Sequence, residues 1–284
     1  MQILPSKELL PYIKHYLFLE RDKNRMKKLR LFSDGNTGMV FCMKDKLMYR
    51  EEGCDMPTRL PGSFIYGQIG EFKDLYLTDK ASFIIIVFEP DGIKKLLGIA
   101  ANEIRDKIIS VEDVFGTGGL LLHEKLFDQP DLEGRLNLLN DFFLKLNPKY
   151  SLSNELLIQA SLNFIIRNKG MITIKQLVKY AGYTERHIER VFNESIGITP
   201  KKFGSIVKLH QFLKLMKNKT VSNNITGFCY ESGYFDQSHL IKEFKKYTGI
   251  TPTQYLNDTY RLATNFLEFN PANTLMSDLY NLSK

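Results

Sequence analysis

The spacing of hydrophobic residues changes from a strand pattern to a helix pattern near residue 90. Before that point, short runs rich in β-branched and aromatic residues are separated by Gly, Pro and Asp. This pattern predicts strands over 40–50, 63–69, 73–78 and 82–89. The last run is apolar on both faces, which fits a buried strand more simply than the wall of a ligand pocket. After Pro90-Asp91-Gly92 the spacing becomes helical, with longer helices expected over 120–127 and 132–146.

One face of the second long helix carries an apolar stripe, formed by Leu136, Leu139, Phe143 and Leu146. The stripe is expected to enter the core or to form a dimer seam, and the core is the simpler interpretation. The helix is expected to end at Asn147, because a residue before proline disfavours helical backbone angles. We place a domain boundary at 147–152.

The second half contains an internal repeat. Gly182-Tyr183 recurs as Gly233-Tyr234, and Gly197-Ile198-Thr199-Pro200 recurs unchanged as Gly249-Ile250-Thr251-Pro252. The copies are offset by 51 residues at the first glycine and by 52 at the second. Two copies of a small three-helix module explain this period better than a solenoid does.

The first copy has the pattern of a helix-turn-helix unit. A short helix over 173–179 is followed by a turn at Gly182, where glycine can take the positive φ that a sharp reversal requires. Thr184 is then expected to cap a helix over 185–195, whose apolar side is Ile188, Val191 and Phe192. The opposite side carries arginines in the first two turns, as insertion into a DNA major groove requires.

The second copy follows the same plan. A supporting helix over 224–231 leads into the turn at Gly233, and Asp236 is expected to cap the next helix. A longer helix over 203–216 joins the units and spans roughly 21–24 Å at 1.5 Å per residue. The two recognition helices are therefore expected to lie about one DNA turn, or 34 Å, apart on one face.

Charge supports a polyanionic partner for this half. The net charge of the chain is +7. Residues 151–264 hold sixteen Lys and Arg against eight Asp and Glu, whereas residues 1–150 hold twenty-two of each. Amphipathic helices with solvated charged faces occur in any all-α domain, but the localised charge together with the repeat favours DNA binding.

At the sequence level, residues 154–257 resemble the AraC/XylS family of bacterial transcriptional regulators, whose DNA-binding domain has two such units. The most similar stretch runs from Gly233 to Lys246, followed by Gly249-Ile250-Thr251-Pro252 and Tyr255. The resemblance implies base-reading positions at Arg186, Glu189, Arg190, Gln237, Ser238 and Lys242. The candidates for phosphate contacts are Thr184, Lys201, Lys202 and Lys245. The chain departs from the family at Val178, Cys229 and Phe212, which are larger than the usual residues, and at Lys242, where arginine is frequent.

The first half is similar to an N-terminal domain of some of these regulators. The matching pieces include Leu10-Pro11-Tyr12-Ile13, Ser33-Asp34-Gly35 and Phe88-Glu89-Pro90-Asp91-Gly92. The fold expected overall is α+β: a β-barrel or cupin-like domain with accessory helices, followed by an all-α domain of two helix-turn-helix units on a linker helix. The expected domains are a regulatory domain over 1–148, a DNA-binding domain over 152–260 and a tail over 261–284.

The expected function is sequence-specific binding of double-stranded DNA to regulate transcription in the cytoplasm, without a cofactor or metal. RNA polymerase, a small-molecule effector and a second copy of the chain are the further partners considered. No membrane segment is expected, because no apolar run approaches about 18 residues. A ligand-blind dimeric regulator is one alternative. Another is a DNA-targeted enzyme, such as an alkyl-transfer repair protein, which would depend on Cys42 or Cys54.

Overall fold

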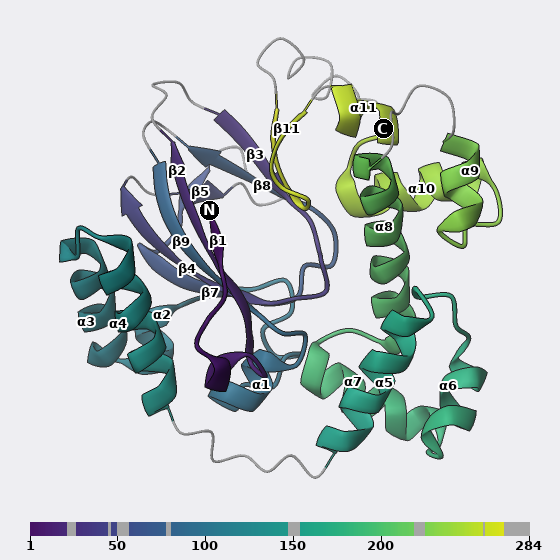
Figure 1. Cartoon of the computed structure of the whole chain (residues 1–284), viewed down its shortest axis with the longest axis horizontal. Coiled ribbons are helices and arrows are strands. Elements are labelled where there is room, and N and C mark those ends of the chain that lie inside the picture. Colours follow the sequence, from purple (N-terminus) through teal and green to yellow (C-terminus); the bar gives the residue numbers. More distant parts are fainter. Residues whose placement is uncertain are drawn as a thin grey trace.

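The computed structural model describes residues 1–21, 27–44, 47–49, 57–77, 81–146, 154–218, 225–257 and 259–269. It contains a β-rich part with accessory helices and an all-helical part beside it (Figure 1). Along the chain, the described helices of this part lie between the first ten strands and the last two. The expected division at 148 and 260 remains a prediction, and residues 147–153 lie outside the described residues.

The first sheet has six strands in the order β1-β2-β9-β4-β7-β10. Their bounds are β1 Gln2–Ile3, β2 Ile13–Arg21, β9 Ala81–Phe88, β4 Gly38–Lys44, β7 Ser63–Tyr66 and β10 Ile108–Ser110. Strand β9 pairs antiparallel with β2 on one side and β4 on the other, so Phe18 lies opposite Ile84 and Phe41 lies opposite the same residue. All but one residue of β9 are buried, which confirms the prediction of a buried strand.

The second sheet also has six strands, in the order β11-β12-β3-β8-β5-β6. Their bounds are β11 Thr259–Ala263, β12 Phe266–Phe269, β3 Lys27–Leu31, β8 Lys73–Leu77, β5 Met48–Tyr49 and β6 Thr58–Arg59. The hairpin of β11 and β12 follows the helical part and returns to pair with β3, with Phe266 opposite Leu31. Through this hairpin, the polypeptide returns to the β-rich part after the helical part (Figure 1).

The β-rich part corrects one expectation. Within the described ranges, the strands form two open sheets and no closed barrel. Apolar residues of both sheets, among them Val40, Phe64, Leu75, Phe83 and Phe266, pack in one cluster between them. The apolar inner faces of the two sheets are thus turned toward each other, as in a two-sheet sandwich.

After β9, three helices lie beside the first sheet, α2 to α4, while α1 lies at the end of its strands (Figure 1). Their bounds are α1 Gly92–Leu97, α2 Val111–Phe115, α3 Thr117–Asp128 and α4 Leu132–Lys145. Leu139 and Phe143 of α4 are fully buried, and Leu136 and Leu146 pack against the same cluster. The apolar stripe of this helix is thus core, as the simpler interpretation predicted.

The helical part contains seven helices among the described residues. They are α5 Glu155–Arg167, α6 Ile174–Ala181, α7 Glu185–Ile196, α8 Pro200–Asn218, α9 Ile225–Glu231, α10 Gln237–Thr248 and α11 Pro252–Asn257. Helices α6 and α7 form the first helix-turn-helix unit, and α9 and α10 form the second. Both turns have glycine in the left-handed region, Gly182 at φ 74° and Gly233 at φ 78°. The prediction of two such units is confirmed.

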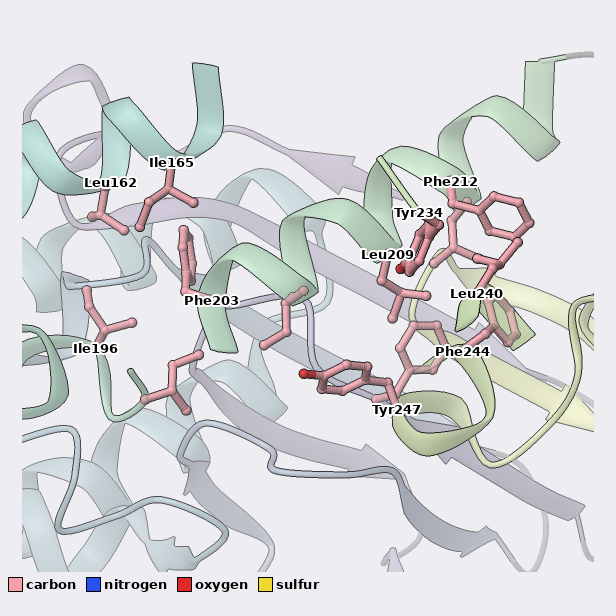
Figure 2. Packing of buried hydrophobic residues seen from close by; sticks show 14 of the residues in the cluster. Leu162, Ile165, Ile196, Phe203, Leu209, Phe212, Tyr234, Leu240, Phe244 and Tyr247 are labelled. Carbon is pink, nitrogen blue, oxygen red and sulfur yellow. The ribbon is translucent and has the colours of Figure 1, made fainter. Parts of the chain in front are cut away.

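Helix α8 carries one unit at each end. Near its start, Phe203 packs with Ile196 of α7 in the first unit and with Leu162 and Ile165 of α5 (Figure 2). Near its end, Phe212 packs with Leu240 and Phe244 of the second unit. Nineteen residues at 1.5 Å per residue give α8 a length of about 28 Å. The linker is longer than the 203–216 segment expected from spacing, because Pro200 is well tolerated in the first turn of a helix.

Candidate nucleic-acid interface

The first recognition helix, α7, is fixed by a strong start signal. Thr184 accepts a hydrogen bond from the backbone N–H of His187 (3.3 Å), as the sequence predicted. The preceding helix α6 starts with a capping box, in which Thr173 and Gln176 satisfy each other's backbone N–H groups. These caps set the position of the turn, and therefore which residues face outward.

The first unit presents its predicted base-reading residues on one side of α7. Ile188, Val191 and Phe192 are buried on the inner side. Arg186 and Arg190 are exposed and Glu189 is half-buried. Arg190 also lies near Glu194, with 3.8 Å between Nη1 and a carboxylate oxygen. The arrangement leaves two guanidinium groups at the surface of the first two turns, as the base-reading prediction requires.

The second recognition helix, α10, has the same plan with different chemistry. The Asp236 carboxylate accepts from the backbone N–H of His239 (2.7 Å), and Leu240 and Phe244 are fully buried. Gln237, Ser238 and Lys242 are exposed on the other side. A glutamine, a hydroxyl and one ammonium group replace the guanidinium groups of the first unit.

The predicted phosphate contacts occupy two different environments. Thr184, Lys201 and Lys245 are exposed, whereas Lys202 is half-buried. Burial lowers the pKa of Lys202, and the nearby cations Arg105 and Lys246 lower it further against Asp106 and Glu71. Lys202, near the start of α8, therefore lies close to charged groups of the β-rich part as well as to Lys246 of α10.

The isolated chemical groups of the sequence do not assemble into a metal site within the described ranges, where no cluster of three His, Cys, Asp or Glu could hold an ion. Cys42 is buried in β4 and Cys229 is buried in α9. Cys54 lies outside the described residues. Across the described part of the chain, no helix combines the length and apolar character needed to cross a bilayer.

Sequence spacing did not predict a large cavity between the two sheets. Its volume is about 1620 Å³, and Phe83, Ile85 and Val87 of β9 form part of its wall. The other side chains of β9, including Ile84 and Ile86, enter the helix-covered core. The run 82–89 is thus a buried strand and a cavity wall at once, and the alternation of its side chains explains both roles.

Comparison with known proteins agrees with this geometry. A helix-turn-helix domain model matches residues 177–258, which include α7, α8, α9 and α10. The chain carries an AraC-type helix-turn-helix domain. A separate model, described as a domain of unknown function (DUF6597), matches residues 1–110.

Relatives of the AraC-type domain are transcriptional regulators. An uncharacterised HTH-type transcriptional regulator of Haemophilus influenzae is 32% identical over 82 residues, which are 29% of this chain and 27% of the relative. The HTH-type transcriptional activator AarP of Providencia stuartii is 26% identical over 90 residues, or 31% of this chain and 64% of AarP. The chain thus matches only part of the length of these curated relatives, and the matches fall short of two thirds of either one.

Solved structures of ToxT from Vibrio cholerae are among those that align with the chain. ToxT from Vibrio cholerae is 13% identical, covers 85% of this chain and 97% of its own, and has a TM-score of 0.48.

Proposed function

We propose that this chain is a DNA-binding transcriptional regulator that reads two adjacent segments of the major groove. One observation carries the proposal: α8 holds two capped recognition helices at its opposite ends, and each exposes polar and cationic side chains. A partner with a repeat of about 34 Å and negative charge along its whole length, such as B-DNA, fits this pair.

In this proposal the first unit supplies most of the base discrimination. Arg186 and Arg190 can each donate two hydrogen bonds to guanine O6 and N7, a pairing worth about 1–3 kcal/mol against a wrong base. Glu189 is suited to accept from a cytosine amino group. Gln237 and Ser238 would read bases in the second segment, while Lys242 would contact a phosphate as a point charge rather than a guanine bidentately.

The phosphate contacts would come from the ends of the helices. Thr184 lies at the N-terminus of α7, where the helix dipole favours an anion. Lys201 and Lys245 are exposed, and Lys202 lies nearer to the β-rich part. Contacts of this kind position the protein and make its affinity depend on salt.

The test starts with selection of a preferred site from random DNA by the full chain. Arg190→Ala should weaken binding to the selected site by about tenfold or more, since loss of a bidentate guanine contact costs about 1–3 kcal/mol. Its binding to random DNA should change much less. Lys125→Ala removes one positive charge from an exposed position of α3 and is the matched control. Equal loss of Arg190→Ala on both DNAs would contradict the base-reading role.

We further propose that the β-rich part binds a small-molecule effector in the cavity between the sheets. Support comes from its volume of about 1620 Å³ and its mostly apolar strand walls, features of ligand sites. Leu213 and Lys214 of α8 also line it, so an occupant would touch the helix that carries both recognition units. Phe83→Trp should fill part of the cavity and abolish the thermal stabilisation given by a screened metabolite. A regulator without a ligand would show no such stabilisation.

We also propose RNA polymerase and a second copy of the chain as protein partners. Leu120, Leu121 and Phe127 on α3 are exposed, and they supply an apolar surface that could meet a partner chain. Sedimentation of the wild type against Leu121→Glu tests the dimer, because a charge in an apolar interface is costly. The action itself is proposed to be cytoplasmic and non-enzymatic.

A further inference from the structure

Both recognition helices end against the β-rich part of the molecule. At the end of α7, the backbone C=O of Glu194 accepts a hydrogen bond from the N–H of Ala101 (2.9 Å). Gly197, which ends the helix at φ 87°, lies so near that a Cβ there would come within 2.8 Å of the Ala101 carbonyl oxygen. The last turn of a helix leaves carbonyl groups without a helical partner, and here one is satisfied by another domain.

The end of α10 is held by a different group. Arg30 of β3 donates from Nη1 to the backbone C=O of Thr248 (3.2 Å), and its side chain is 1% exposed. The other nitrogens of the guanidinium bind both carboxylate oxygens of Asp74, at 2.6 and 2.7 Å. Its plane lies over the ring of Phe72, with 3.9 Å to the ring centroid. Asp74 and Phe72, both in the β-rich part, therefore hold the Arg30 side chain in the position from which it binds α10.

The glycine that ends α10 makes this contact possible. Gly249 has φ 71°, and a Cβ there would collide with the Arg30 guanidinium and with the Phe72 ring. Gly249 and Gly197 are equivalent positions of the repeat. In both units, the glycine that ends the recognition helix therefore lies at the contact with the β-rich part.

A side chain connects this contact with base reading. Lys94 of α1 pairs with Glu194 (Nζ to Oε1, 2.9 Å), while the other carboxylate oxygen lies 3.8 Å from Arg190. Lys94 and Arg190 therefore share one carboxylate, each on a different oxygen. Removal of either partner would change the charge environment of the other.

We propose that Arg30 and Ala101 are positioning residues that hold the two recognition helices at one separation. The inference rests on the proposed function, because it concerns how that site is set up to read DNA. Helix α8 is a single rod between the units, and the β-rich part is a second connection between the same two helices. Two connections fix both the distance and the rotation of α7 relative to α10. A chain built this way selects DNA sites with one spacing between the two half-sites.

The test measures spacing dependence with the full chain on its selected site. The affinity is compared with that for the same site carrying two extra base pairs between the half-sites. The wild type should lose at least tenfold on the longer site. Arg30→Met removes the donors but keeps apolar contact with Phe72, and Asp74 keeps its pairing with Lys28 at 3.1 Å. This variant should lose less than threefold on the longer site.

Two further variants make the result decisive. Lys94→Ala acts at the partly exposed edge of the first contact, where its side chain is 16% exposed, and should relax the spacing penalty at least twofold. If Arg30→Met fails to fold, the spacing penalty of Lys94→Ala tests the inference by itself. Arg135→Ala, which breaks a bond to the carbonyl of Gln129 within the β-rich part, should keep the wild-type penalty. An unchanged penalty in a folded Arg30→Met or Lys94→Ala protein would overturn the inference. A wild type that prefers no DNA sequence would instead contradict the proposed function.

Discussion

The two helix-turn-helix units share a packing plan and differ in the side chains they expose. Both have a left-handed glycine in the turn, a side-chain cap and a fully buried phenylalanine, Phe192 in one and Phe244 in the other. The outer side of α7 presents two arginines, whereas that of α10 presents an amide, a hydroxyl and a lysine. The two copies thus share the residues that set the fold of a unit, whereas the residues exposed on the outer sides of α7 and α10 differ.

The difference suggests a division of roles. Arginine pairs bidentately with guanine and discriminates bases, whereas lysine acts as a mobile point charge. We therefore expect specificity to come mainly from the first unit and salt-dependent affinity to have a larger share in the second.

The shared packing can be tested with its two equivalent phenylalanines. Phe192→Ala and Phe244→Ala should each lower the free energy of unfolding by about 3–5 kcal/mol, as expected when a buried aromatic ring leaves a cavity. Phe244 packs edge-on against Phe212 and Tyr255, and Phe192 against Phe203. Urea denaturation measures both, with Phe235→Ala as the control because Phe235 is 84% exposed. A loss below about 1 kcal/mol for only one ring would show that the units do not share their packing.

The difference between the exposed sides of α7 and α10 can be tested with Lys242→Ala. The affinity of this variant for DNA should fall by about tenfold at low salt, on selected and random DNA alike. Loss of one phosphate contact should also reduce the slope of log affinity against log salt by about 1. Filter binding over a range of salt concentrations measures both quantities. A loss confined to the selected site would instead assign base reading to Lys242.

The caps offer a smaller comparison. Asp236→Ala and Thr184→Ala should each destabilise by about 1 kcal/mol, since each leaves a helix N–H group without its partner. The loss should be larger for Asp236, because its carboxylate also interacts favourably with the helix dipole. Chemical denaturation gives the order, and Ser→Ala changes outside the caps, such as Ser238→Ala, provide the baseline. The reverse order would mean that charge does not matter at these helix starts.

The smallest expected effect concerns pH and the contact between α8 and the β-rich part. His210 of α8 bonds through Nε2 to the carbonyl of Ser33 (3.0 Å). Burial lowers the pKa of His210, against the opposing influence of Asp34 and of this hydrogen bond. The folded state therefore binds the proton less well than the unfolded chain, in which histidine titrates near 6.5.

His210 thus contributes stability that is present above about pH 6.5 and is lost as the pH falls toward the lowered pKa of the folded state. Thermal unfolding measured between neutral and mildly acidic pH should show this slope, and His210→Gln should reduce it. Part of the slope should persist, because burial and then Lys14 also lower the pKa of His15. An unchanged slope in His210→Gln would contradict the assignment.

The local pattern of the sequence predicted the helical half well. Turn glycines, caps and three-residue apolar spacing lie close together in the chain, so α6, α7 and α10 follow from short windows. The same reasoning identified β9 and β8 from runs of β-branched and aromatic residues.

Features that depend on distant residues were not predictable in this way. Strand β2 was missed although its residues alternate between buried and half-buried from Tyr16 to Leu19, since Lys14, His15 and Glu20 interrupt the apolar run. The barrel expectation was wrong because closure depends on which distant strands pair. No local sequence pattern marked Arg30 as a contact residue, because its hydrogen bond to Thr248 joins residues 218 apart in the chain.

The hairpin of β11 and β12 has a practical consequence for dissecting the molecule. Strand β12 pairs with β3, so it protects one side of β3 from solvent and from other chains. A truncated protein ending near residue 258 would leave the backbone groups of β3 open along a free edge, and free edges recruit strands from neighbouring molecules. A shortened protein should therefore extend through the last hairpin, or it will be prone to edge-to-edge aggregation.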